Sequence, residues 1–136
     1  MFTEADLELL RRPLQAMVTV APKGDRWPAP RPVWYELTDD GDIQIFSLPE
    51  ALRIKRLREM PRASVVVSAP VGEPEYWVSV EGSATMHTEG ARELAARLAE
   101  RYYGPDDTEH REMVDGWQSL DLVRIVMRPE RVSRGG

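Results

Sequence analysis

The chain has 136 residues, no cysteine and a formal net charge of −5 at pH 7, and its length suits one domain with its own hydrophobic core. The missing cysteine excludes disulfides, thiolate metal sites and a cysteine nucleophile, and the negative net charge argues against a nucleic-acid binder, which needs a basic face. No apolar run approaches the ~20 residues of a membrane helix and residues 1–12 are not signal-like, so we expect a cytoplasmic protein without a nucleic-acid or membrane partner.

The first residues are predicted to form a short helix and then a strand. Thr3 stands before acidic residues and the apolar Leu7 and Leu10, which indicates a capped helix. Residues 14–21 are rich in β-branched side chains and are typical of a strand that closes in the turn 22–25.

Prolines at alternate positions mark the next segment, and they are Pro28, Pro30 and Pro32. Because proline cannot donate to a sheet ladder, we expect this segment to be extended and to lie at a sheet edge before a strand at residues 33–37. The turn 39–42 contains a glycine that tolerates positive φ, which predicts a hairpin between residues 33–37 and the strand at 43–46.

The middle of the chain alternates between a basic helix and buried strands. Residues 52–58 have helical spacing with Pro49 as the expected first-turn residue, and their outward face should be cationic. A buried strand is predicted at 62–69. Residues 76–87 indicate one bent strand, or two strands joined at Gly82, and a barrel needs such corners.

The last third begins with the most regular helical pattern in the chain. Apolar residues recur every three or four positions over 89–103, and Gly104 and Pro105 end that helix. A second short helix to about Trp117 and a strand at 120–127 follow, and residues 129–132 form a tail that closes the domain. About six strands with peripheral helices favour a mainly-β barrel over a parallel α/β sheet.

Conventional catalytic and metal-binding patterns are weak in this sequence. Neither His87, on a predicted strand, nor His110, in a charged segment, lies in a nucleophile or zinc motif. No glycine-rich phosphate loop is present, which argues against P-loop and Rossmann nucleotide binding. We therefore expect no catalytic side chain and no metal site.

A compact basic block, residues 53–58, is the strongest candidate for a binding site. Four positive charges within six residues repel one another and are better used facing an anion such as phosphate, although a solvated helix face is the alternative. Planar apolar surface is offered by Trp27, Trp34, Tyr76 and Trp77. Such aromatic residues on strands serve either as core or as a platform for a cofactor.

The order of these motifs resembles the pyridoxamine-phosphate-oxidase-like superfamily. The resemblance rests on five segments in this order: residues 27–35, 40–42, 45–47, the basic block and 61–65. It is closest to the small actinobacterial branch of flavin and deazaflavin oxidoreductases, through Pro32-Val33-Trp34 and Pro129-Glu130-Arg131-Val132.

This resemblance implies one six-stranded split β-barrel of the FMN-binding type over residues 1–136, a homodimer, and a cofactor in a groove between subunits. By position, Ser47 and Leu48 would line the phosphate and ribityl region, and Arg53 and Lys55 would contact the phosphate. The family usually has Lys-x-Arg-Asn-Leu where this chain has Arg53-Ile54-Lys55-Arg56-Leu57. The residues expected to bind the cofactor are Pro32, Val33, Trp34, Ser47, Leu48, Arg53, Lys55, Arg56 and Trp77.

The function implied by the resemblance is an oxidoreductase that uses the deazaflavin coenzyme F420 for hydride transfer to a small organic acceptor. Such a cofactor carries the chemistry itself, so no catalytic triad is expected. Two alternatives share the fold: an FMN-dependent oxidase or reductase, and a non-catalytic protein that binds a flavin, haem or another tetrapyrrole.

Overall fold

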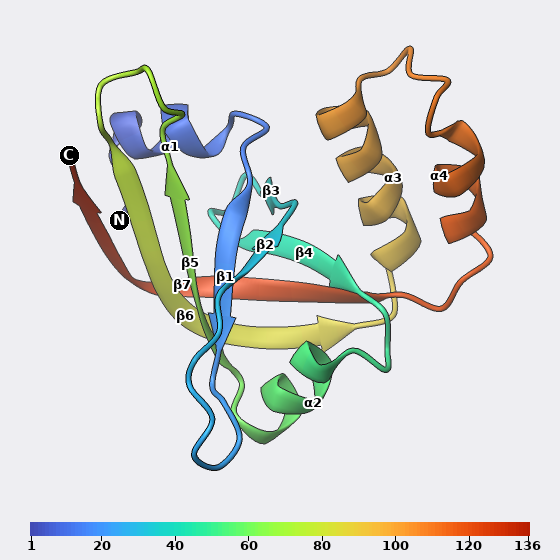
Figure 1. Ribbon diagram of the computed structural model, residues 1–136, viewed down its shortest axis with the longest axis horizontal. Coiled ribbons are helices and arrows are strands. Elements are labelled where there is room, and N and C mark those ends of the chain that lie inside the picture. The colour runs from blue at the N-terminus through green and yellow to red at the C-terminus, as the bar shows by residue number, and fades with distance from the viewer.

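One antiparallel sheet of seven strands curls into a half-barrel with four helices around it (Figure 1). The computed structural model describes residues 1–136. The helices are α1 (Glu4–Leu10), α2 (Leu52–Glu59), α3 (Ala91–Tyr103) and α4 (Arg111–Trp117). The strands are β1 (Ala16–Val20), β2 (Arg31–Val33), β3 (Glu36–Leu37), β4 (Ile43–Ser47), β5 (Arg62–Ser68), β6 (Trp77–His87) and β7 (Val123–Gly135). The mainly-β architecture with peripheral helices is as expected, with one more strand than predicted.

The extra strand arises where the barrel is split. The sheet order is β2-β1-β5-β6-β7-β4-β3, so β2 and β3 lie at opposite edges although only Trp34 and Tyr35 separate them in the chain. The prediction of one strand over 33–37 was wrong. The amide of Tyr35 donates to the hydroxyl of Tyr102 at 3.1 Å instead of to a neighbouring strand, and this takes the backbone out of the ladder.

The bend in the long strand β6 is made at Gly82. The pairing of β6 with β7 shifts by one residue between Glu81 and Gly82, and a Cβ on Gly82 would collide with the carbonyl oxygen of Arg128. The strand is therefore continuous but bent. Pro129 pairs opposite Gly82 at the register shift, so β7 continues to Gly135 and the expected tail at 129–132 is part of the strand.

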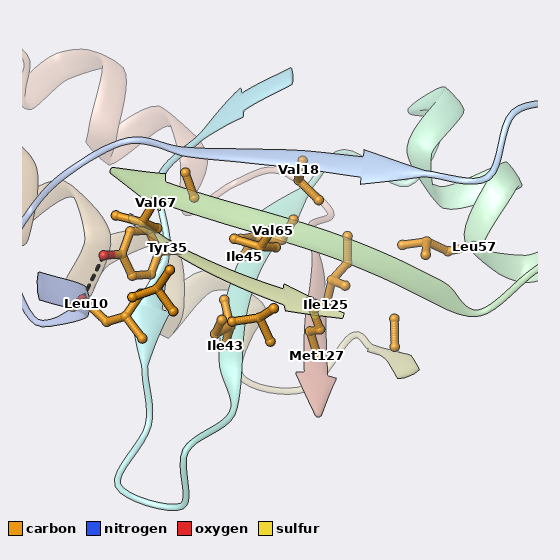
Figure 2. Packing of buried hydrophobic residues seen from close by; sticks show 14 of the residues in the cluster. Leu10, Val18, Tyr35, Ile43, Ile45, Leu57, Val65, Val67, Ile125 and Met127 are labelled. Atoms are coloured by element: carbon orange, nitrogen blue, oxygen red, sulfur yellow. Dashed lines mark hydrogen bonds between the residues drawn. The ribbon is translucent and has the colours of Figure 1, made fainter. Parts of the chain in front are cut away.

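The core fills the inside of the half-barrel (Figure 2). Strand residues alternate between this core and the outer face, as Val78 and Val80 in β6 do, which is the period expected for a sheet buried on one side. Tyr35 is fully buried there, and its hydroxyl donates to the Leu10 carbonyl at 2.7 Å. Burial raises the pKa of Tyr35, so its hydroxyl stays protonated and keeps this bond to the end of α1.

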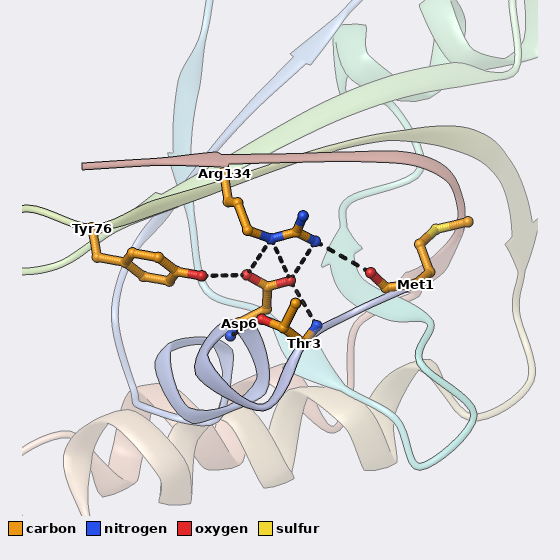
Figure 3. A network of polar contacts seen from close by, with 5 residues as sticks. All are labelled: Met1, Thr3, Asp6, Tyr76 and Arg134. Atoms are coloured by element: carbon orange, nitrogen blue, oxygen red, sulfur yellow. Dashed lines mark hydrogen bonds and ion pairs between the residues drawn. The ribbon is translucent and has the colours of Figure 1, made fainter.

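The two chain ends are joined by a buried ion pair. Thr3 and Asp6 form the capping box of α1, which confirms the predicted cap. Asp6 also accepts hydrogen bonds from Tyr76 at 2.6 Å and from Arg134 at 2.7 Å (Figure 3). Helix α1 is thus fixed to the start of β6 and to the end of β7.

Helix α2 differs from its prediction in one respect that concerns function. It begins at Leu52 with Ala51 as its N-cap, so Pro49 lies before the helix and not in its first turn. The basic residues do not all face outward: Arg56 is buried, together with Ile54 and Leu57. A helix of about two turns has one buried and one exposed face. Arg56 lies three residues after Arg53, which places it toward the buried face.

Helices α3 and α4 form a hairpin set to one side of the half-barrel (Figure 1). Helix α3 begins at Ala91, two residues later than predicted, because Gly90 takes a φ of 78° and acts as its N-cap. The predicted second helix is confirmed and ends at Trp117. None of the four helices has the length and apolar character that a membrane crossing requires.

Candidate functional site

A groove of about 610 Å³ opens between α2 and the segment that joins β1 to β2. These two parts of the chain lie together at the lower end of the half-barrel in Figure 1. Five positively charged side chains and no carboxylate line the groove, and they are Lys23, Arg26, Arg31, Arg53 and Arg56. In a chain with a net charge of −5, such a concentration of cations makes a local field that attracts anions.

Arg56 is the most unusual side chain of the groove. It is only 8 % exposed, and its Nε and Nη1 atoms have no hydrogen-bond partner. The carboxylate of Glu59 lies 3.3 Å from Nη1 but without hydrogen-bond geometry, and that side chain is 60 % exposed. A buried guanidinium with two nitrogen atoms that make no hydrogen bond is costly. The observation therefore points to an anionic ligand that would supply the missing acceptors.

Arg53 is held in place by the end of strand β4. Its Nη1 atom donates to the hydroxyl of Ser47 at 2.8 Å. Burial lowers the pKa of Arg53, and repulsion from Arg31 lowers it further. Both effects disfavour the charged form in the free protein. A bound anion would relieve both of them, because it would screen the two guanidinium groups from each other and pair with them.

Apolar surface lies beside these cations in the same groove. Trp27 is 88 % exposed and Leu52 is 63 % exposed, and Pro32 completes this side. Large apolar side chains that are so exposed and gathered in one groove are typical of binding sites. The groove therefore suits a ligand that carries both an anionic group and an apolar surface.

Four of the nine predicted site residues come together here. Pro32, Arg53 and Arg56 line the groove, and Ser47 reaches it through its hydrogen bond to Arg53. Leu48 follows Ser47 at the end of β4 and is 44 % exposed. Their role in cofactor binding stays a prediction, but the geometry is compatible with it.

Apart from Leu48, four predicted residues lie outside this groove. Val33 is half-buried against the core, and Lys55 is exposed on α2. Trp34 stacks on the ring of Tyr102 at a centroid distance of 4.8 Å, under helix α3. Trp77 lies on the outer face of the sheet near the C-terminus of β7. Their role in cofactor binding stays a prediction.

Sequence reasoning missed three of the five cations, which are Lys23, Arg26 and Arg31. They belong to a proline- and glycine-rich segment that was predicted only as a turn and an extended edge. A signal was present, because basic and aromatic residues alternate with prolines between Lys23 and Pro32. Loops held by rigid strands commonly carry binding residues.

A second hollow of about 710 Å³ adjoins the groove on the outer face of the sheet. The two share Val20, Ala21 and Pro22 at the end of β1. Its charged residues are balanced, two arginines against two glutamates, and they are Arg62, Arg131, Glu81 and Glu130. The hollow therefore lacks the preference for anions that the groove has, but it offers space next to it.

Both histidines lie away from these two hollows. His87 bonds to Thr85 at the end of β6, with 2.9 Å between the Nε2 and Oγ1 atoms. His110 lies beside Asp107 at 3.2 Å and stacks on Tyr103 before α4. Neither histidine lines the groove or the second hollow.

Comparison with known proteins identifies the family of the fold. A family model described as pyridoxamine 5'-phosphate oxidase matches residues 2–133. A search of curated protein sequences gives no significant match. The resemblance that the sequence motifs indicated is therefore confirmed at the level of the family.

Solved structures share this architecture at low sequence identity. A conserved hypothetical protein from Mycobacterium tuberculosis is 22% identical with a TM-score of 0.78, over 98% of this chain and 84% of that chain. An F420 reductase is 21% identical with a TM-score of 0.77, over 97% and 98% of the two chains. A haem storage protein from Vibrio cholerae is 17% identical with a TM-score of 0.69, over 99% and 94%. At these identities the likeness concerns the fold, and the fold occurs with different cofactors.

Proposed function

The chain belongs to the pyridoxamine 5'-phosphate oxidase family, and on that premise we propose that it is an oxidoreductase that uses the deazaflavin coenzyme F420. Its acceptor would be a small organic molecule. The observation that carries the proposal is the groove beside α2, which is lined by five cations and no carboxylate, and in which the buried Arg56 has two nitrogen atoms without a hydrogen bond. A phosphate-bearing cofactor would supply the acceptors that these groups lack.

The residues of the groove would hold the cofactor by its anionic part. Arg53 and Arg56 would bind the phosphate, and the hydroxyl of Ser47 fixes the direction of Arg53. When bound, the deazaflavin supplies the hydride. The chain's own contribution would be to orient the ring, to exclude water from it and to leave the adjoining hollow for the acceptor. No catalytic side chain is required for these tasks.

Two observations favour the deazaflavin over FMN. Lys23 and Arg26 add positive charge on the loop side of the groove, beyond what one phosphate requires, and this suits a tail that also bears carboxylates. The F420 reductase of similar fold matches almost the full length of this chain. An FMN-dependent oxidase or reductase remains the alternative, because Arg53 and Arg56 would serve its phosphate equally well.

A non-catalytic haem binder is the third reading, and the haem storage protein of the same fold favours it. Haem iron is usually held by an axial histidine, cysteine, methionine or tyrosine. No histidine lines the groove and the chain has no cysteine. The cations of the groove could pair with the propionates of a haem, but the groove has no imidazole or thiolate to bind its iron. This argues for a flavin or deazaflavin.

Equilibrium titration tests the choice of cofactor. Coenzyme F420 should bind at least about tenfold more tightly than FMN, because one additional charge-assisted contact contributes on the order of 1.5 kcal/mol. Absorbance and tryptophan fluorescence measure both affinities on the purified protein, and hemin serves as the third ligand. If FMN binds tightly and resists exchange while F420 does not bind at tens of micromolar, the result would favour an FMN-dependent oxidase or reductase.

The protein is further proposed to act as a homodimer, because one face of its sheet is uncovered. No helix packs on the outer side of β1, β5 and β6, where apolar and small residues alternate with the core residues. Met17, Val66 and Trp77 supply the apolar surface on this side, among serines. A partner on this face would cover the hollow beside the groove and give the cofactor a second wall.

Light scattering with size-exclusion chromatography measures the oligomeric state. The expected mass is twice the 15.5 kDa of the chain. Val66→Glu should give a monomer, because a buried interface does not tolerate an unpaired charge. Its matched control is Thr85→Glu, an exposed position at the far end of β6. A monomeric wild-type protein at micromolar concentration would contradict the model of a shared site.

A further inference from the structure

Trp27 is the only exposed tryptophan of the chain, and it packs on no other ring. Trp34 stacks on Tyr102 with 4.8 Å between the ring centroids, Trp117 contacts a second aromatic ring, and Trp77 lies over a glycine of β7. Trp27 is 88 % exposed. Leaving such a large apolar side chain in water is unfavourable, and an indole with an exposed face commonly marks a contact with a ligand or a partner.

The loop that carries Trp27 has a defined backbone. The amide of Arg26 donates to the carbonyl of Lys23 at 3.2 Å, and Gly24 provides the φ of 61° that this turn requires. Pro28 follows Trp27 directly and restricts the backbone before it. The indole is therefore presented by a turn of limited freedom, which lowers the entropy that binding would cost.

Trp27 shares its groove with the cations of the proposed phosphate site. The groove is lined by Arg53 and Arg56 and also by Trp27, Leu52 and Pro32. The first set fits an anion, and the second set fits a planar apolar ring. A flavin or deazaflavin is a ligand in which a planar ring and an anionic tail are joined.

We propose that Trp27 stacks on the ring of the cofactor whose phosphate is held by Arg53 and Arg56. This inference rests on the proposed function and adds a ring-binding residue to it. Stacked aromatic pairs are favourable beyond the area that they bury, so the indole would fix the ring while the arginines fix the tail. The competing occupant of this surface is a second copy of the chain.

Paired substitutions at Trp27 test the stacking. Trp27→Leu removes the ring but keeps an apolar side chain, and Trp27→Phe keeps an aromatic face. Trp117→Phe is the control, because that indole already packs within the chain. Each variant is titrated with FMN, with coenzyme F420 and with inorganic phosphate, while tryptophan emission and calorimetry are recorded. A melting curve for each variant checks that the fold is intact.

We expect the Trp27→Leu substitution to weaken the binding only of ligands that contain an aromatic ring. Trp27→Leu should weaken FMN and F420 binding roughly tenfold, in line with the effect of removing an aromatic ring from a stacked base. Binding of inorganic phosphate should stay within about twofold of the wild type, and Trp27→Phe should recover most of the lost affinity. Quenching of tryptophan emission by the ligand should decrease in Trp27→Leu but persist in Trp117→Phe.

Three results would overturn the inference, each in a different way. Unchanged FMN and F420 affinity in Trp27→Leu would leave the proposed function intact and remove only the stacking. Wild-type protein that binds neither cofactor would remove both. Trp27→Leu protein that becomes monomeric without any ligand would assign the indole to a partner chain instead.

Discussion

Replacing Arg56 with methionine is expected to weaken the binding of F420 or FMN roughly tenfold to a hundredfold, because a charge-assisted hydrogen bond contributes on the order of 1.5–3 kcal/mol. The expectation follows from the burial of Arg56 and from the two nitrogen atoms that find no acceptor in the chain. Methionine has a similar length and no charge, so it keeps the packing of α2 and removes the anion contact together with the ion pair to the exposed Glu59.

The same substitution should not destabilise the ligand-free protein. Arg56 is a buried charge whose ion pair with Glu59 is largely exposed on the Glu59 side, and replacing such a charge by an apolar side chain of similar size is often neutral or stabilising. We therefore expect the melting temperature of Arg56→Met to equal or exceed that of the wild type. This combination of lost binding and retained stability is what a residue kept for a ligand should show. A structural residue would show the reverse.

Arg58→Met is the matched control, because it makes the same chemical change on an exposed residue of the same helix. Its affinity for the cofactor should stay close to that of the wild type. Lys55→Met gives the further comparison, since Lys55 is exposed and lies outside the groove of its own chain. Weaker binding at high ionic strength should be found in the wild type and be less marked in Arg56→Met. Equal loss in all three variants would point to a general effect of charge and would contradict the assigned site.

The regular helices and strands of the fold could be predicted from local patterns in the sequence. Period-two alternation marks β4 and the first part of β7, and the spacing of apolar residues marks α3. The errors lie where a distant contact decides the local structure. Nothing near Tyr35 indicates that its amide will bond to Tyr102, 67 residues away, and this contact turns one predicted strand into two.

The candidate site could be predicted only in part from the sequence, for a related reason. The basic block on α2 is a local feature, and it correctly drew attention to Arg53 and Arg56. Whether a helical residue faces the core depends on what the helix packs against, so the inward position of Arg56 and the outward position of Lys55 needed the structure. The contribution of the loop 22–30 also depends on tertiary structure, because only the fold brings it to α2.

Asp6→Asn is expected to lower the free energy of unfolding at neutral pH by about 3 kcal/mol, the lower end of what breaking a buried ion pair costs. Asp6 is fully buried, and its carboxylate accepts from Arg134, Tyr76 and the backbone amide of Thr3 (Figure 3). We expect the lower end of this energy range because the Arg134 side chain is 36% exposed and can be hydrated after the ion pair is broken. For a domain of this size the melting temperature should fall by on the order of 10 °C.

Glu73→Gln is the control for this substitution. Glu73 pairs with Arg12 at 2.8 Å, and like the Asp6 pair this contact joins the N-terminal segment to a distant part of the chain. Its two side chains are 41% and 43% exposed, so the pair is screened by water and salt. Its loss should leave the melting temperature close to that of the wild type. An equal effect of both substitutions would show that burial does not distinguish the two pairs.

The contribution of Asp6 should also depend on pH, with a defined sign. Burial alone would raise the pKa of Asp6, but the hydrogen bonds from Arg134, Tyr76 and Thr3 outweigh it and hold the pKa well below its usual value of 3.8. The unfolded chain therefore takes up this proton before the folded chain does. The stabilisation is complete above 3.8, begins to be lost as the pH falls below that value, and disappears only below the lowered pKa of the folded chain. Urea unfolding of the wild type and Asp6→Asn, from neutral pH down to about pH 3, should show the gap between the two midpoints beginning to narrow in acid, as the carboxylate of the unfolded chain is protonated. A gap between the midpoints that stays constant over this range would mean that Asp6 stabilises the fold by packing and neutral hydrogen bonds, and that the charge of the carboxylate contributes nothing.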